Sequence, residues 1–332
     1  MARSHLTLAA LATSAVAGLD LAGAAPIGGS GDAEFDSALL TGRDGRHWII
    51  RVPRSEAAEA TQSADLVALR ALSAGIRSRL PFTISSYAGQ TPIDSTRAVV
   101  YDFVYGTKAT LDDLDPGSDG LAASVGRAIA AIHNLPTSFV ADAGLPILGS
   151  GECLRSAVTV MDRSAATGLV PMSLLARWEK ATEDSALWQF QPTVINNALG
   201  ADSFLLSDGS ISGLLGWQDL RVGDPARDLA WLLGARGDEV ADSAFEAYLA
   251  VRPGDRQVTQ RALLYAELEI AKWLLHGTEV RSTAIVDDAV EMLAGLVDSV
   301  ENDVMNPIGA QTMPSMAVEE VEEFLSRSER AI

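Results

Sequence analysis

The sequence contains very little cysteine and histidine. Its 332 residues include one cysteine, Cys153, and four histidines, His5, His47, His133 and His276. A lone thiol excludes an intramolecular disulfide framework and a multi-cysteine metal site. No two histidines have the spacing of a metal-ligand pair. The apolar residues must therefore supply the core without cross-links.

Basic charge is also scarce. The chain has 25 Lys and Arg against 44 Asp and Glu, a formal net charge of −19 at pH 7. Such an excess repels nucleic-acid phosphates and anionic lipid, so neither nucleic acid nor a membrane is expected as a partner. The charge is compatible with a cationic small-molecule ligand, or simply with high solubility.

Long hydrophobic runs are absent as well, since no stretch approaches the roughly 20 apolar residues of a membrane span. Arg3, a mildly apolar run over 6–21 and the small residues 22–25 resemble a signal peptide. The same run has apolar residues at helical spacing: Leu8, Leu11, Ala12 and Ala15. Because cleavage near Ala25 would remove a strand-like segment, we interpret the run as a retained helix and expect a cytoplasmic protein.

The first third of the chain predicts a small sheet with a helix. Residues 35–41 and 47–53 are strand-like and flank a Gly-containing turn, which indicates a hairpin. A helix is expected over 56–74, and a strand over 97–104 that ends before Gly106.

The remainder is mostly helical. Apolar residues recur at helical spacing within 121–132, 264–275 and 286–300, and a short hairpin is expected over 204–215. We therefore predict an α+β fold with a sheet-plus-helix lobe over 1–106 and a larger helical lobe over 107–302. Residues 303–332 are expected to form a linker and an acidic C-terminal helix.

The segment 213–230, G-L-L-G-W-Q-D-L-R-V-G-D-P-A-R-D-L-A, resembles the signature G-x-I-D-W-x-D-A-x-x-G-D-P-x-x-D-L-A of aminoglycoside and macrolide phosphotransferases. The segments 48–54, 99–106 and 125–136 resemble the third strand, the linker strand and a helix of that family. The resemblance implies a bilobal protein-kinase-like fold. It also implies ATP or GTP with Mg²⁺ as cofactors and a small molecule as the acceptor.

The catalytic residues of that family are nevertheless replaced within the loop region 194–217. The family loop H-G-D-L-x-x-x-N aligns with N-N-A-L-G-A-D-S at 196–203. Asn196 then stands at the His position, and Ala198 stands at the position of the catalytic Asp. Ser203 and Gly216 stand at the two metal-ligand positions. The general base and both metal ligands are therefore missing.

Nearby carboxylates offer weak substitutes. Asp202 and Asp219 could approach a metal after a shift in register, although a turn position for Asp202 and bonds from Asp219 to the loop backbone are simpler interpretations. The resemblance assigns structural roles to Trp217, Asp224 and Asp228, and the two aspartates are expected to cap and brace the loop.

The small lobe retains candidates for nucleotide binding. Gly28-Gly29-Ser30-Gly31 could cover a phosphate or form an ordinary loop. Arg51 stands where the family places a phosphate-binding Lys, and Asp65 where it places the paired acid. Arg keeps the charge and can bind phosphate through two hydrogen bonds. The alternative is two solvated surface charges.

Three functions remain open at this stage. The chain could be a catalytically impaired phosphotransferase that binds a nucleotide or a small molecule. It could be an active enzyme with a relocated metal site. It could also be a non-enzymatic protein that docks on a partner through residues 303–332.

Overall fold

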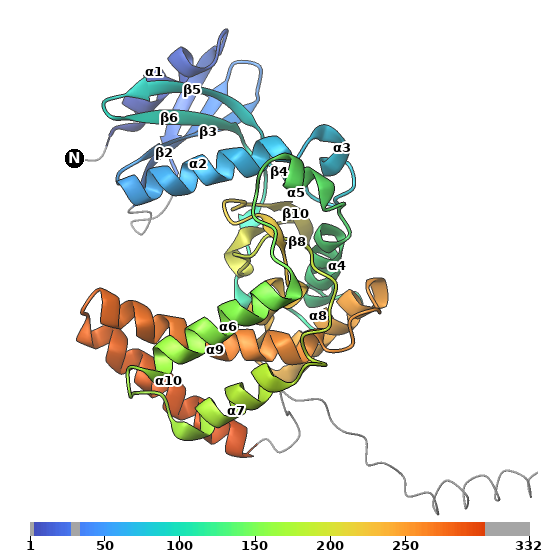
Figure 1. Cartoon of the computed structure of the whole chain (residues 1–332). Helices are drawn as coiled ribbons and strands as arrows, with labels where there is room; N and C mark the ends of the chain where they lie inside the picture. Colours follow the sequence, from blue (N-terminus) through green and yellow to red (C-terminus); the bar gives the residue numbers. More distant parts are fainter. Residues whose placement is uncertain (1–2, 28–33, 303–332) are drawn as a thin grey trace, which may run out of the picture.

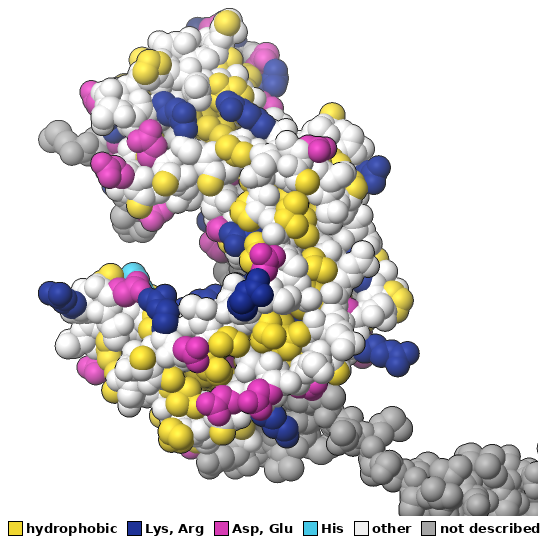
Figure 2. Space-filling view, viewed as in Figure 1, with side chains coloured by type: hydrophobic (Ala, Val, Ile, Leu, Met, Phe, Trp, Pro, Cys, Tyr) yellow, Lys and Arg dark blue, Asp and Glu magenta, His cyan; other side chains and the backbone are white. Residues whose placement is uncertain are grey.

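The chain forms two lobes, and the computed structural model describes them over residues 3–27 and 34–302 (Figure 1). The smaller lobe contains a sheet, and the larger lobe is mainly helical. Residues 103–106 carry the chain from one lobe to the other. Figure 2 shows a hollow between the lobes that opens on one side of the molecule. The predicted α+β, two-lobed fold is confirmed.

The sheet of the small lobe has five antiparallel strands in the order β1-β2-β3-β6-β5. Its strands are β1 (Leu21–Pro26), β2 (Phe35–Gly42), β3 (His47–Pro53), β5 (Tyr87–Ile93) and β6 (Thr96–Asp102). The predicted hairpin is β2–β3, in which Ser37 lies opposite Arg51.

Helices cover both faces of this sheet. Helix α1 (His5–Ala15) packs on one face, where Leu8 joins a core with Ala98 and Val100. Helix α2 (Glu56–Ala71) covers the other, where Leu66 joins a core with Val99 and Tyr101. Because side chains alternate along a strand, β6 is buried on both sides. The N-terminal apolar run is thus a helix, as predicted.

Strand β5 gave no clear signal in the sequence. Gly89 and Pro92 both lie within it, and both residue types are rare in strands. The strand is at the edge of the sheet, where a proline without a backbone N–H is tolerated. This strand was therefore not predicted from the sequence, because its glycine and proline are typical of loops.

The predicted helical faces lie in α4, α9 and α10. The helices beyond α2 are α3 (Ala74–Arg77), α4 (Leu121–His133), α5 (Ser138–Asp142), α6 (Ser150–Ala165), α7 (Met172–Glu183), α8 (Asp238–Val251), α9 (Val258–Glu279) and α10 (Thr283–Asn302). Four 3₁₀ turns accompany them: η1 (Leu111–Asp113), η2 (Ala201–Ser203), η3 (Pro225–Asp228) and η4 (Ala230–Gly234). One apolar core extends from Leu66 to Leu293 and so includes residues of both lobes.

Two short β-ladders position the loop region 194–217. The predicted hairpin is β9 (Phe204–Ser207) with β10 (Ser210–Leu214), in a sheet ordered β4-β10-β9-β7 with β4 (Thr83–Ile84) and β7 (Thr107–Lys108). The second ladder pairs β8 (Thr193–Ile195) with β11 (Arg221–Gly223). The loops after β8 and after β10 are thereby brought side by side.

Some expectations cannot be compared with the structure. The glycine-rich turn at 28–31 and the linker and acidic helix at 303–332 lie outside the described residues. Within the described part of the chain, no helix is both long and apolar enough to span a bilayer.

The close approach of α4 and α8 gives a test of the helical lobe. A Cβ at Gly126 would lie 2.1 Å from the Ala244 carbonyl oxygen, so Gly126→Ala must push the helices apart. We expect a loss of about 1–3 kcal/mol in the free energy of unfolding, measured with urea.

The matched control is Gly295→Ala in α10, where a Cβ would meet nothing within 4 Å. Because Ala favours helix over Gly, this variant should gain up to about 1 kcal/mol. Equal urea midpoints for the two variants would contradict the packing argument.

Candidate functional site

The buried carboxylate of Asp228 organises the loop after β8. Its Oδ2 accepts a hydrogen bond from the backbone N–H of Asn196 at 2.8 Å, and its Oδ1 accepts one from Asn197 at 2.6 Å. His133 Nε2 lies 3.2 Å from Oδ2, and His133 Nδ1 lies 2.9 Å from the Tyr248 hydroxyl. These contacts brace the loop and explain why Asn197 can hold a positive φ of 69°.

Asn196 connects the two loops that carry the family's catalytic positions. Its Nδ2 donates to the Gly216 carbonyl at 2.7 Å, and its Oδ1 accepts from the backbone N–H of Ala198 at 3.2 Å. The Asn196 side chain is fully buried. The position aligned with the family's His is therefore a structural bridge.

The positions aligned with the base and the metal ligands offer few oxygen atoms. Ala198 presents an exposed methyl group. The Ser203 hydroxyl accepts from the Gly200 backbone N–H at 3.2 Å. Gly216 supplies a carbonyl that Asn196 already occupies. Mg²⁺ prefers carboxylate and water oxygens in a near-octahedral arrangement, so these residues do not fit that ion.

The two substitute carboxylates do not converge on the loop. The Asp202 side chain is 74% exposed and lies 3.5 Å from Lys108 Nζ. Asp219 Oδ1 lies 3.0 Å from Arg221 Nη2. Over residues 3–27 and 34–302, no group of three or more His, Cys, Asp or Glu side chains is arranged to hold a metal ion.

Arg51 and Asp65 are electrostatic neighbours without a direct ion pair in the described chain. The Arg51 guanidinium lies 3.8 Å from the centre of the Phe35 ring. Asp65 Oδ1 accepts from the backbone N–H of Trp217 at 3.0 Å, which links α2 to the loop after β10. Burial raises the pKa of the Asp65 carboxyl, while the Trp217 hydrogen bond and the Arg51 charge oppose that rise.

Asp224 lies at the centre of a second buried network. Its Oδ1 accepts from the Ala226 backbone N–H at 3.0 Å and caps η3. Its Oδ2 accepts from Arg261 Nε at 2.8 Å and from the Tyr265 hydroxyl at 3.0 Å. Trp217, in the loop after β10, is also buried.

Sequence reasoning missed the partners in both networks. Arg261 and Tyr265 lie on α9, and Arg261 lies one turn before the apolar residues at 264–275 that predicted this helix. A buried position for a charged residue was the available signal. His133 lies in a segment that carries the family resemblance, but the pattern alone gave it no partner.

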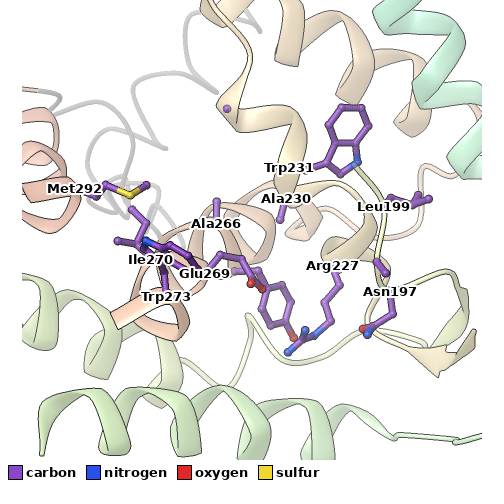
Figure 3. A pocket seen from close by; sticks show the side chains of 13 residues that line it. Asn197, Leu199, Arg227, Ala230, Trp231, Ala266, Glu269, Ile270, Trp273 and Met292 are labelled. Atoms are coloured by element: carbon purple, nitrogen blue, oxygen red, sulfur yellow. The ribbon is translucent and has the colours of Figure 1, made fainter. Parts of the chain in front are cut away.

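A cleft in the helical lobe opens beside the loop. Its volume is about 490 Å³, and Figure 3 shows its walls. It is lined by residues of the loop, of η3 and η4, and of helices α9 and α10: Asn197, Ala198, Leu199, Arg227, Ala230, Trp231, Gly234, Tyr265, Ala266, Glu269, Ile270, Trp273 and Met292. We call it the helical-lobe cleft. The exposed face of Ala198 thus borders a cavity of small-molecule size.

Comparison with known proteins identifies relatives of the chain. A model of the phosphotransferase enzyme family matches residues 27–265. The uncharacterized protein YcbJ of Bacillus subtilis (strain 168) is 24% identical over 228 residues, which are 65% of this chain and 72% of that protein.

Solved structures share the fold at low identity. Macrolide 2'-phosphotransferase type I is 23% identical, with a TM-score of 0.68 over 88% of this chain and 98% of its own. The macrolide 2'-phosphotransferase of Brachybacterium faecium is 20% identical, with a TM-score of 0.66 over 87% and 98%. The GDP complex of aminoglycoside 2'-phosphotransferase-IIIa is 17% identical, with a TM-score of 0.70 over 90% and 100%.

The role of Asp228 can be tested with Asp228→Asn. The amide cannot accept from both loop N–H groups and His133, so the free energy of unfolding should fall by about 3 kcal/mol. The backbone amides of Asn196 and Asn197 should exchange hydrogen faster, as measured by mass spectrometry or NMR.

Asp202→Asn is the control, because that side chain is exposed and should change stability by less than about 0.5 kcal/mol. Unchanged exchange at Asn196 and Asn197 in the Asp228 variant would show that other contacts hold the loop.

Asp65 should make stability depend on pH. Its pKa is raised on folding, so the folded state binds the proton more tightly than the unfolded chain does. The stabilisation by that proton is complete below the ordinary value of 3.8 and is lost as pH rises through the folded pKa. The Asp65→Asn variant has no titrating carboxyl at this position, so its stability does not fall in this way as pH rises. Its amide oxygen can still accept the hydrogen bond from Trp217.

Urea unfolding from below pH 3.8 to neutral pH measures the effect. The stability of Asp65→Asn relative to the native chain should increase with pH. A difference that stays constant would refute the raised pKa.

Proposed function

The chain belongs to the phosphotransferase enzyme family, and on this premise we propose that it is a catalytically impaired member that binds a small molecule or nucleotide without efficient phosphoryl transfer. One observation carries the proposal. The two loops that bear Ala198 and Gly216 are held together by Asn196 and Asp228, with no carboxylate at either position. The contacts that hold the two loops are present, and the side chains that serve the family as general base and metal ligands are absent.

The expected loss of rate is large. A positioned general base contributes a factor of about 10²–10⁴, and each factor of ten corresponds to about 1.4 kcal/mol in the barrier. Phosphoryl transfer also depends on neutralising the phosphate charge, a task for which Mg²⁺ is normally used. Loss of base and metal ligands together should therefore raise the barrier by on the order of 5 kcal/mol or more, although such losses need not add.

Nucleotide binding is part of the proposal. Structures sharing this fold are described as GDP and ADP complexes. In this chain the Arg51 charge remains in the small lobe and is available to a phosphate. ATP and GTP are both candidate ligands.

The helical-lobe cleft is the proposed site for a small molecule. Similar folds are described in complexes with kanamycin, gentamicin and streptomycin. The cleft of this chain borders Ala198, so a ligand bound there would lie against the position of the missing base.

A cytoplasmic location also remains a prediction.

The alternatives lead to different experimental results. A relocated active site would require Asp202 or Asp219, which pair with Lys108 and Arg221 at the surface. A docking role would require residues 303–332, which lie outside the described chain. Loss of turnover in Asp202→Ala or Asp219→Ala would favour the first alternative. Loss of a captured partner on removal of 303–332 would favour the second.

We expect no Mg²⁺-dependent transfer of phosphate from ATP or GTP to kanamycin, gentamicin, streptomycin or a macrolide. Radiolabelled transfer assays measure this, with an active family member as the positive control. In parallel, any rise in melting temperature caused by ATP or GTP should be equal with Mg²⁺ and with a chelator, because the loop supplies no carboxylate to hold the ion.

The variant Ala198→Asp with Ser203→Asn and Gly216→Asp restores the family's groups. The backbone at Gly216 has a φ of +76°, a left-handed conformation that Asp adopts more readily than most other residues. The variant should acquire transfer or nucleotide hydrolysis that depends on Mg²⁺. Clear turnover by the native chain would overturn the proposal.

A further inference from the structure

Two pairs of apolar side chains lie on opposite walls of the helical-lobe cleft. Figure 3 shows Trp231 and Leu199 on one side, and Trp273 and Met292 on the other. The indole N–H of Trp231 donates to the Asp228 carbonyl at 2.9 Å, and that of Trp273 donates to Asp288 Oδ2 at 2.8 Å. Each ring also has an aromatic neighbour inside the protein, with Trp231 5.7 Å from Phe204 and Trp273 5.5 Å from His276 between ring centres. Both polar atoms are already satisfied, so the ring surface that lines the cleft can contact an apolar ligand.

The charged groups that line the cleft are balanced, although the whole chain is strongly acidic. The lining contains one carboxylate, Glu269, and one guanidinium, Arg227. Glu269 already pairs with Lys272 on the next turn of α9. The two lining charges cancel, in a protein of formal charge −19, and Lys272 outside the lining compensates Glu269.

Arg227 is held in place without an anionic partner. Its guanidinium lies 4.7 Å from the centre of the Tyr265 ring, and the Tyr265 hydroxyl donates to Asp224. Within residues 3–27 and 34–302, no side-chain acceptor or carboxylate pairs with this guanidinium. The stacked face fixes the group, and its N–H donors remain available.

A second cation close by adds to the need for an anion. Burial lowers the pKa of the Lys272 ammonium, and the Arg227 charge lowers it further. Like charges disfavour each other, so a negative group placed beside Arg227 would relieve this repulsion as well as accept hydrogen bonds.

We propose that the helical-lobe cleft binds an amphipathic anion, with a flat apolar body between Trp231 and Trp273 and a carboxylate or phosphate at Arg227. This inference rests on the proposed function, which places the small-molecule site in this cleft. It assigns the ligand a charge opposite to that of the cationic ligand that the overall acidity of the chain allowed.

The same groups disfavour a polycation. A ligand with several ammonium groups requires several carboxylates at its site, and the lining provides Glu269, which is engaged with Lys272. Such a ligand would also lie against Arg227. Charge repulsion there would weaken binding.

The test compares probes of one shape and different charge on the native chain. Naphthoate, naphthyl phosphate, naphthylmethanol and naphthylmethylammonium are titrated by calorimetry and by quenching of tryptophan fluorescence. At least one of the two anions should bind ten-fold or more tightly than the neutral alcohol, and the ammonium should bind most weakly. Comparison of the two anions identifies which anionic group the cleft prefers.

Variants locate the site. Arg227→Gln should weaken binding of the preferred anion by roughly ten-fold or more, since a charge-assisted hydrogen bond is lost. The affinity for the alcohol should not change. Arg227→Lys should retain part of the preference. Asp202→Asn, which lies outside the cleft, should change neither the affinity for the anion nor that for the alcohol. Melting temperatures exclude unfolding as the cause.

Two results would overturn the inference. One is tighter binding of the ammonium probe that Glu269→Gln abolishes, and the other is no binding of any probe. These measurements require no phosphoryl transfer. A native chain that turns over substrate but binds the anions would overturn the proposed function and leave this inference standing.

Discussion

The architecture of the site depends on the enclosed carboxylate of Asp228. An isolated buried charge is costly, and this one is tolerated because two backbone N–H groups and His133 surround it. The carboxylate in turn fixes the path of the chain after β8 and allows the left-handed backbone at Asn197. None of these contacts involves the side chain at position 198, so the loop keeps its shape with alanine there.

Local patterns were sufficient to predict much of the fold. The β2–β3 and β9–β10 hairpins and the apolar faces of α4, α9 and α10 depend on spacings within short segments, and each was found where expected. Strand β5 was missed because its glycine and proline obscure the pattern. Long-range side-chain contacts were beyond reach, since Asp65 and Trp217 are 152 positions apart and meet only after the lobes have formed. The stacking of Arg51 on Phe35 and the charge of the helical-lobe cleft depend in the same way on tertiary placement.

The family's aspartates fall into two physical classes in this chain. Asp224 and Asp228 are buried and satisfy several donors each, so their removal would destabilise the fold. Position 198, which the resemblance aligns with the family's catalytic Asp, is exposed, and replacement of its side chain leaves no buried donor without a partner. A lineage can therefore lose the second class at little cost in stability and keep the first. This difference explains how a well-preserved signature at 223–230 can accompany an altered loop at 196–203.

The hydrogen bond from Trp217 to Asp65 joins a helix of the small lobe to a loop beside the hairpin of the large one. Any motion that draws α2 away from that loop must hydrate the carboxylate, and hydration returns its proton affinity toward that of a free aspartate. The two lobes are held in register by a contact one residue from Gly216, the position that aligns with a metal ligand of the family.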